Sequence, residues 1–311
     1  MFQKMLFVLV ATLAPATLMA ESGGDTCSAG GKSDIVATAV GAGKFDTLVA
    51  AVKAADLVSA LQAKGPFTVF APTNEAFARL PEGTVQNLLR PENKKALAGI
   101  LTYHVVPGRL DAKHVIASGG AVTLNGQRID FSRSEKGVMV DGAKVIMTDI
   151  ECSNGIIHVI DRVILPSSDN LVATAKNAKV FNTLLTAAKE AGLAGALQGD
   201  GPFTVFAPTD EAFGKLPAGT VETLLKPENR EQLAAILKFH VVSGRVYAKQ
   251  ALKAGTAKTL LGPAVSIEVV NGQPRVQEAN ILKTDIDASN GVIHVIDSVI
   301  LPPSKETAAR L

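Results

Sequence analysis

The chain has no tryptophan, only two tyrosines and only two cysteines among its 311 residues. So few cysteines exclude a small fold held together by several disulfides, and also a zinc or iron–sulfur centre built from several thiolates. At most one disulfide can form within the chain. Most aromatic rings belong to the 12 phenylalanines, which are therefore the main candidates for large core residues.

The chain also lacks an excess of charge of either sign. Lys and Arg number 31 against 29 for Asp and Glu, which excludes the strongly basic surface that binds nucleic acids or acidic membranes. No stretch reaches the roughly 20 uninterrupted apolar residues of a transmembrane helix. With 47% hydrophobic and 19% charged residues, the sequence predicts a folded chain of about two domains.

The first 20 residues have the three-part plan of a secretory signal peptide. Lys4 precedes the apolar run Met5–Leu13, and small residues follow up to Ala20. We expect residues 1–20 to be removed after Ala20 and the chain to be secreted, either to the periplasm or outside the cell. Residues 21–33 then form an N-terminal segment rich in glycine and serine.

Three blocks of sequence recur at an offset of 136 residues, without insertion or deletion. The blocks, each with its second copy, are Gly65–Thr73 and Gly201–Thr209, Tyr103–Val106 and Phe239–Val242, and Ser153–Asp161 and Ser289–Asp297. This period exceeds that of solenoid repeats, so each copy is predicted to be a domain with its own core. We expect domains at 34–166 and 170–302 and a C-terminal tail at 303–311.

Phenylalanines support the duplication, because eight of them form four pairs across the copies at the same offset. The pairs are Phe45 and Phe181, Phe67 and Phe203, Phe70 and Phe206, and Phe77 and Phe213. Large rings kept in register are predicted to be core anchors, since each buries a large apolar area.

Within a copy, the apolar pattern changes from helical to strand-like along the chain. Helical spacing covers 45–61, a short apolar strand at 67–71 ends at Pro72, and further helices are predicted at 84–90 and 92–103. After His104 the turn pairs and β-branched residues indicate strands. Each copy is therefore predicted to be α+β, with helices first and a sheet after them.

The three blocks resemble the three signatures of the fasciclin-like domain family. Thr68–Phe77 resembles the first motif, Tyr103-His104 the Tyr-His motif and Gly155–Asp161 the closing motif, and both copies carry them in order. The resemblance implies an α+β fold of two tandem fasciclin-like domains, each a β-wedge or sandwich flanked by several helices. It also implies a secreted protein similar to fasciclin and periostin, which adheres to cell-surface or matrix proteins or polysaccharides and uses no cofactor.

His104 and His240 lie where a helix is predicted to pass into the sheet. A histidine there can bind a metal, act as a base or hydrogen-bond the backbone, and we favour the structural role because no third ligand follows at a recognised spacing. The same interpretation applies to His158 and His294. His114 has no counterpart, because Gln250 stands in its place.

In animal members of the family, the Tyr-His segment and an Asp-Ile pair are associated with integrin adhesion. The corresponding partner-binding candidates in this chain are Tyr103, His104, Asp149 and Ile150 in the first copy and Phe239, His240, Asp285 and Ile286 in the second. An exposed carboxylate beside an apolar side chain can complete the coordination of a partner's cation. The alternative is that the Asp-Ile pair only marks an ordinary strand-to-loop transition. We favour this alternative over integrin binding, because a shared fold does not identify the partner. Because the second copy has Phe239 in place of the motif's tyrosine, the first copy is the better adhesive candidate.

No catalytic motif stands out in the sequence. It has no Gly-x-Ser-x-Gly elbow, metalloprotease helix or phosphate-binding glycine loop, so we expect no enzyme activity. The alternative function is a carrier of a small apolar ligand, carotenoid or lipid-like, because the hydrophobic fraction is high and some carotenoid-binding algal proteins resemble this family.

Cys27 and Cys152 are predicted to form a disulfide, since an exported chain meets oxidising conditions. The bond would tie the N-terminal segment to the loop before the closing strand. Two free thiols are the alternative.

Overall fold

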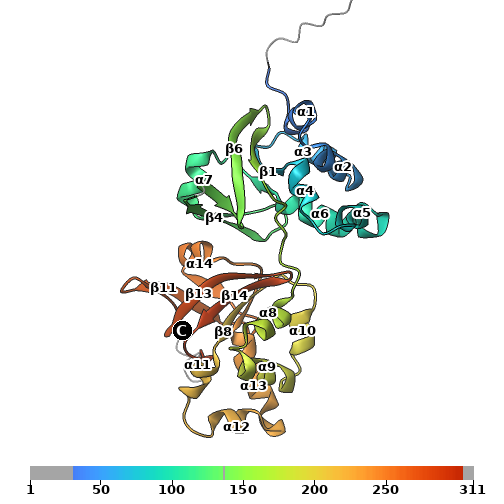
Figure 1. Ribbon diagram of the computed structural model, residues 1–311. Helices are drawn as coiled ribbons and strands as arrows, with labels where there is room; N and C mark the ends of the chain where they lie inside the picture. The colour runs from blue at the N-terminus through green and yellow to red at the C-terminus, as the bar shows by residue number, and fades with distance from the viewer. Residues whose placement is uncertain (1–30, 136, 304–311) are drawn as a thin grey trace, which may run out of the picture. The chain divides into compact units, whose positions relative to one another are not determined.

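The computed structural model describes residues 31–135 and 137–303, which form two domains of the same architecture (Figure 1). In chain order the first domain contains α1 Ile35–Gly41, α2 Asp46–Ala54, α3 Val58–Leu61, β1 Phe67–Pro72, α4 Asn74–Ala78, α5 Thr84–Leu88, the 3-10 helix Pro91–Asn93, α6 Lys94–Tyr103, β2 Val105–Pro107, α7 Ala112–Ser118, β3 Gly120–Val122, β4 Arg128–Ser134, β5 Gly137–Val140, β6 Ala143–Cys152 and β7 Gly155–Ile160. The second contains α8 Leu171–Ala178, α9 Asn182–Glu190, α10 Ala194–Gln198, β8 Phe203–Pro208, α11 Asp210–Gly214, α12 Thr220–Leu224, the 3-10 helix Pro227–Asn229, α13 Arg230–Phe239, β9 Val241–Ser243, α14 Ala248–Ala254, β10 Thr256–Lys258, β11 Ala264–Val270, β12 Gln273–Val276, β13 Ala279–Ala288 and β14 Gly291–Ile296.

Each domain has one seven-stranded, barrel-like sheet. The strand order is β2-β1-β7-β6-β5-β4-β3 in the first domain and β9-β8-β14-β13-β12-β11-β10 in the second. β1 pairs with β7 in parallel, from Phe67 opposite Gly155 to Pro72 opposite Ile160, and the pairs that flank them are antiparallel. The sheet therefore joins the first and last blocks of the sequence side by side.

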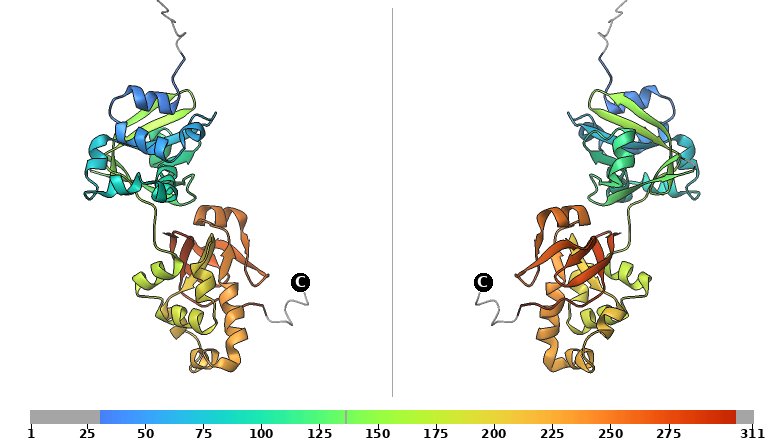
Figure 2. Two further views of the ribbon diagram at one scale, coloured as in Figure 1. Left: turned by 90° about the vertical axis from the view of Figure 1, so that its right-hand side faces the viewer. Right: turned by 90° about the vertical axis from the view of Figure 1, so that its left-hand side faces the viewer.

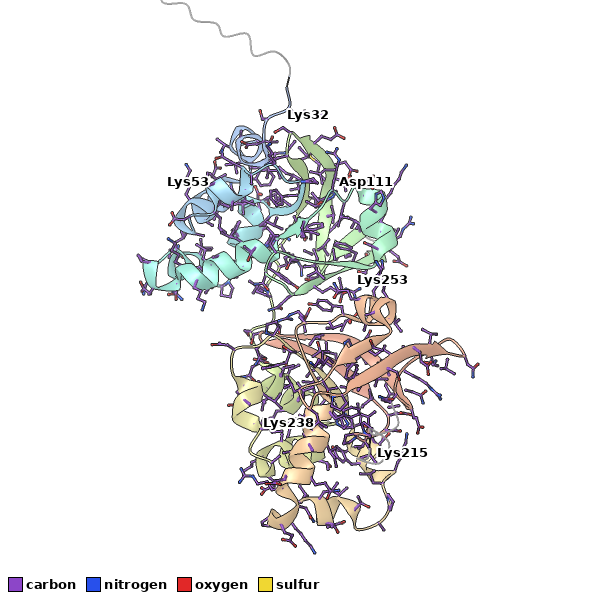
Figure 3. All side chains as sticks on the ribbon, turned by 180° about the vertical axis from the view of Figure 1, so that it is seen from behind. Lys32, Lys53, Asp111, Lys215, Lys238 and Lys253 are labelled. Atoms are coloured by element: carbon purple, nitrogen blue, oxygen red, sulfur yellow. The ribbon has the colours of Figure 1, made fainter. Side chains whose placement is uncertain are left out.

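β1 and β7 form the centre of the domain because both of their faces are covered. One face packs Val69 and Ile157 against the helices, and the other packs Phe70 and Ile160 against the remaining strands and α7. Strands buried on both faces read as continuous apolar runs, which explains the lack of alternation in these blocks. In Figures 1 and 2, α1 to α6 gather on one side of the strands, and α7 lies apart from them. Charged side chains such as Lys53 and Lys215 lie on the outside of the domains (Figure 3).

The turn between β6 and β7 holds the entry of the chain in place. The side chain of Asn154 accepts a hydrogen bond from Ile35 N (2.9 Å) and donates to the carbonyls of Leu61 (2.7 Å) and Ala63 (2.9 Å). Ser153 N donates to Ser33 O (2.9 Å). Both N–H groups of this amide and its oxygen are thus bonded within the fold, and the start of the domain is fixed beside the start of β7.

The second domain repeats this arrangement at the turn between β13 and β14. Asn290 accepts from Leu171 N (2.9 Å) and donates to the carbonyls of Leu197 (2.9 Å) and Gly199 (2.8 Å). Ser289 N donates to Asp169 O (2.7 Å).

The predicted α+β class is confirmed, and so are most of the predicted core anchors. Phe45, Phe70 and Phe77 are buried, as are their partners in the second copy, whereas Phe67 and Phe203 are half-buried. Thr73 caps α4 by accepting from Ala76 N (3.3 Å).

The prediction of strands throughout the region after His104 was wrong at one helix in each copy. α7 begins after Asp111, whose carboxylate caps it by accepting from His114 N (2.9 Å). The second copy has Tyr247 in place of Asp111, so no repeated N-cap residue marked this helix in the sequence.

We expect Gly155→Ala to destabilise the first domain by about 1–3 kcal/mol, because a Cβ at this position would overlap the carbonyl oxygen of Phe67 across the parallel pair. Gly41→Ala, where an added Cβ would meet no atom within 4 Å apart from its chain neighbours and its own helix backbone, is the control and should change stability by less than about 1 kcal/mol. Urea denaturation measures both. Equal midpoints for the two variants would contradict the proposed close approach.

Candidate functional site

The Tyr-His segment lies in the core of each domain. Tyr103 is 5% exposed, His104 2%, Phe239 0% and His240 1%, and each pair spans the end of a helix and the residue before a strand. As partner-binding residues these four stay predictions. Their burial favours the structural role that the sequence analysis preferred for the histidines.

Backbone groups satisfy both ring nitrogens of His104 and His240. Nδ1 of His104 donates to Ile100 O (2.8 Å), and its Nε2 accepts from Ile164 N (3.3 Å). His240 makes the same bonds with Ile236 O (2.8 Å) and Ile300 N (3.2 Å). This pattern requires the neutral ring with its proton on Nδ1. Burial lowers the pKa of His104 and of His240 to about 4.

Tyr103 differs from Phe239 by a hydroxyl group, which forms hydrogen bonds in the first domain. The phenol donates to Asp141 Oδ2 (2.6 Å) and lies 3.0 Å from Arg128 O. Burial and the neighbouring carboxylate raise the pKa of Tyr103 well above its usual value. Partial burial raises the pKa of Asp141, while the phenol's hydrogen bond opposes that rise. Gln277 occupies the position of Asp141 in the second domain, which matches the loss of the phenol there.

The Asp-Ile pairs lie within β6 and β13, not at a strand-to-loop transition. Asp149 (φ 59°) and Asp285 (φ 58°) have left-handed backbones at a register shift, which is a β-bulge. Asp tolerates this backbone better than most residues. The bulge explains why apolar and polar residues do not alternate along these strands. For the same reason, the sequence pattern indicated strands in this region but did not give their bounds.

Each bulge is fixed from two sides. The carboxylate of Asp149 accepts from Ala112 N (3.0 Å) at the start of α7, and its backbone N donates to Nδ1 of His158 (3.3 Å). Nε2 of His158 in turn donates to Leu110 O (2.7 Å). Burial lowers the pKa of His158, so the ring is kept neutral in this role.

The second domain repeats the unit with Asp285, Ala248 and His294. Asp285 accepts from Ala248 N (2.7 Å), its backbone N donates to Nδ1 of His294 (3.3 Å), and Nε2 of His294 donates to Val246 O (2.9 Å). Burial lowers the pKa of His294.

The two aspartates differ in what else their carboxylates contact. Asp149 is exposed, whereas the Asp285 side chain is only 10% exposed and forms an ion pair with Arg128 (2.6 Å). Ile150 and Ile286 are half-buried and pack against the helix-side core of their domains. The first copy therefore presents the more accessible carboxylate.

Exposed residues precede Asp149 along β6. We call Ile146, Met147, Thr148 and Asp149 the β6 surface; all four are exposed, with Ile146 at 51% and Met147 at 48%. The corresponding positions of β13 are Leu282, Lys283, Thr284 and Asp285, so a lysine replaces the exposed methionine there. The sequence analysis missed Ile146 and Met147 because the bulge interrupts the two-residue period.

The buried polar side chains form hydrogen bonds within the fold. Within residues 31–135 and 137–303, every buried side-chain nitrogen or oxygen has a hydrogen-bond partner, and no three or more His, Cys, Asp or Glu residues lie together as metal ligands. The histidines and aspartates described above therefore act as structural connections in this state.

The predicted disulfide stays a prediction, because Cys27 lies outside the described residues. Cys152 is the last residue of β6, not part of a loop, and is buried with its Sγ 3.4 Å from Thr38 Oγ1. The predicted signal peptide and residues 304–311 of the tail predicted at 303–311 also lie outside the described part of the chain.

Comparison with models of known protein families identifies the family of this chain. The model of the fasciclin domain matches residues 43–166 and 179–302. The chain belongs to the fasciclin domain family. Both matches contain the parallel pair, the buried histidines and the bulge described above.

Relatives include proteins from bacteria and animals. Protein sll1483 of Synechocystis is 60% identical over 132 residues, which cover 42% of this chain and 73% of that protein. The transforming growth factor-beta-induced protein ig-h3 of Sus scrofa is 32% identical over 263 residues, covering 81% of this chain. Human periostin is 30% identical over 267 residues, covering 83% of this chain. The chain spans only 37% and 31% of the lengths of these two animal proteins.

A solved structure described as a FAS1 domain pair from the insect cell adhesion molecule Fasciclin I matches with a TM-score of 0.42 and 20% identity. It covers 81% of this chain and 95% of that chain. None of these relatives is named as a carrier, so the comparisons do not favour the carrier alternative. Within the described residues, no helix is both long and apolar enough to cross a membrane.

We expect the free energy of unfolding to fall as the pH is lowered from about 6.5 to 4. His104 and His240 have folded-state pKa values of about 4, below the ordinary 6.5, so the unfolded chain binds more protons in this range. The loss reaches the order of 3 kcal/mol per ring at about pH 4 and is complete only below the folded-state pKa. Urea denaturation between pH 7 and 4 measures it. Imidazolium signals from these rings in NMR spectra of the folded protein at pH 5 would contradict the neutral assignment.

We expect Tyr103→Phe to destabilise the first domain by about 1–3 kcal/mol, because it removes the donor to Asp141. The reciprocal Phe239→Tyr should also destabilise, since it places a hydroxyl in a fully buried site whose domain has Gln277 at the position of Asp141. Thermal and urea denaturation measure both variants. A neutral Tyr103→Phe would show that the phenol adds nothing beyond its ring.

Proposed function

We propose that the chain is a secreted, non-catalytic adhesion protein that binds a cell-surface or extracellular-matrix partner through the β6 surface of its first domain. Membership of the fasciclin domain family supports the adhesive role. The observation that carries the site is the exposure of Asp149 beside Ile146 and Met147.

The chemistry of the β6 surface suits a protein partner. Exposed aliphatic side chains gain from contact only with an apolar counterpart, which a polysaccharide provides less well than a protein. Asp149 supplies a carboxylate that can accept hydrogen bonds or complete the coordination of a cation held by the partner. Among the partners expected from the sequence, a protein is therefore favoured over a polysaccharide.

Rigidity also supports this surface. Asp149 is fixed by Ala112 on one side and by His158 on the other, so its backbone loses little freedom when a partner binds. A preorganised surface avoids part of the ordering cost of association.

The second domain is proposed to contribute less at the equivalent position. Asp285 is already paired with Arg128, and Lys283 replaces the exposed methionine. Where both domains do bind, two linked weak sites raise the overall avidity when the spacing of the partner fits.

The non-catalytic part of the proposal is supported by the use of the titratable groups. His104 and His240 each bond the backbone through both nitrogens, and His158 connects Leu110 to Asp149. None of these rings has a nitrogen left for a substrate proton.

We expect Asp149→Asn to reduce binding on the order of tenfold, because it removes the charge while Asn keeps the acceptor for Ala112 N and tolerates the left-handed backbone. Attachment of cells to surfaces coated with the mature protein measures the change, with binding to extracted matrix proteins as a second readout. Met147→Lys, which installs the residue of the second domain, should weaken binding as well.

The matched control is Asp285→Asn, which makes the same change in the second domain. It should leave attachment unchanged while lowering stability, because it breaks the ion pair with Arg128. Equal losses from the two substitutions, or none from Asp149→Asn in a folded protein, would remove the β6 surface from the proposal.

A further inference from the structure

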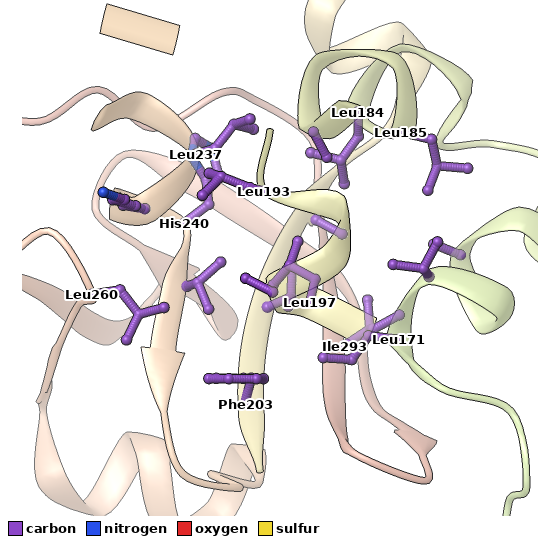
Figure 4. Close-up of a pocket in the computed structure, with 18 residues that line it drawn as sticks. Leu171, Leu184, Leu185, Leu193, Leu197, Phe203, Leu237, His240, Leu260 and Ile293 are labelled. Carbon is purple, nitrogen blue, oxygen red and sulfur yellow. The ribbon is translucent and has the colours of Figure 1, made fainter. Parts of the chain in front are cut away.

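The second domain contains an apolar cavity that is much larger than its counterpart in the first. Its volume is about 180 Å³, against about 40 Å³ at the equivalent place in the first domain. The cavity lies between the helices and the central strands (Figure 4). Its walls include Leu184, Ala188, Leu197, Phe203, Leu237 and Ile293.

The lining offers a ligand almost no hydrogen-bonding group. His240 is part of the wall, but both of its nitrogens are bonded to the backbone at Ile236 and Ile300. Lys238 also borders the cavity and is exposed, so its aliphatic stem can line the wall while its ammonium group stays in water. A sugar or another polar molecule would therefore lose its bonds to water without replacement.

Two substitutions between the copies make side chains at this cavity smaller, whereas Leu185 in place of Val49 is larger. Leu184, Leu197, Val205 and Ile293 have identical counterparts in the first domain, but Val52 is replaced by Ala188. Both of these residues are buried on the wall, so the change removes two methyl groups from the lining. Val58 is likewise replaced by Ala194, in the helix that covers the cavity from outside.

The helix α10, which covers part of the cavity, is only five residues long. Its sequence begins Ala194-Gly195-Ala196, and glycine within a helix lowers its stability. Leu197 of α10 is half-buried, whereas its counterpart Leu61 is buried. A small molecule can therefore enter where α10 meets the solvent with little disturbance of the sheet.

From this size and chemistry, we infer that the second domain binds one small, compact, apolar molecule of about the size of a single six-membered hydrocarbon ring. An engineered cavity of about 150 Å³ lined by similar side chains stays dry and binds benzene or xenon. A carotenoid or a long acyl chain is far larger than this cavity, so the inferred ligand is not the one considered in the sequence analysis. The inference is independent of adhesion, since the β6 surface belongs to the other domain.

The test is a titration of the mature two-domain protein with benzene, in which the NMR signals of the methyl groups are recorded at each step. We expect saturable shifts of Leu184, Ala188, Leu197 and Ile293, which line the cavity, and no comparable shifts of Leu48, Val52, Leu61 and Ile157, which line its counterpart. Unsaturable shifts, or equal shifts in both domains, would overturn the inference.

Ala188→Val provides the decisive variant, because it installs the residue that the first domain uses at the same place. We expect it to weaken benzene binding at least tenfold. The reciprocal Val52→Ala should create a second benzene site in the first domain, and it tests the same inference if Ala188→Val fails to fold. Unchanged binding in Ala188→Val, or no new site in a folded Val52→Ala, would show that these methyl groups do not control the cavity.

Discussion

The parallel pairing of β1 with β7 is the interaction on which each domain depends. It joins residues 67–72 to residues 155–160 and is buried on both faces, so the helix-side core and the strand-side core both pack against it. The close approach of the two strands leaves no space for a Cβ at Gly155. Asn154 then fixes the chain entry beside this pair, and Asp161 closes its other end by accepting from Lys144 N (2.7 Å). The motif residues of the closing block are thus explained by the fold they hold together.

The two copies show how one scaffold supports different surfaces and interiors. The backbone connections are repeated almost unchanged, including the neutral histidines and the bulge. The differences lie in single side chains. Tyr103 is replaced by Phe239, and the exposed Asp149 corresponds to Asp285, which is paired with Arg128. In the helices, the buried Val52 is replaced by Ala188. Because the scaffold fixes the backbone at each position, such changes alter the local chemistry without altering the topology. Each copy serves as the natural control for the other.

The sequence predicted the duplication, the α+β class and most of the core, because these follow from a repeat without gaps and from long apolar runs. It did not predict α7 and α14, since the N-cap Asp111 is replaced by Tyr247 in the second copy. Nor did it predict the β6 surface, because exposure at Ile146 and Met147 depends on a bulge whose backbone angle no local pattern reveals. The contrast between Asp149 and Asp285 depends on Arg128, which is more than 150 residues from Asp285 in the chain (|i−j| = 157). Contacts of that separation are set by tertiary structure alone.

The position of the chain entry determines how a domain responds to pulling. Ser33 and Ile35 are bonded beside the start of β7, and the chain leaves the domain after the far end of the same strand. Tension between the two ends of the domain is therefore directed along β7, so its ladders with β1 and β6 are loaded in shear and must break together. Separation one bond at a time, as in a zipper, requires a force across the strands. The same geometry at Asp169 and Leu171 gives the second domain an equal mechanical clamp.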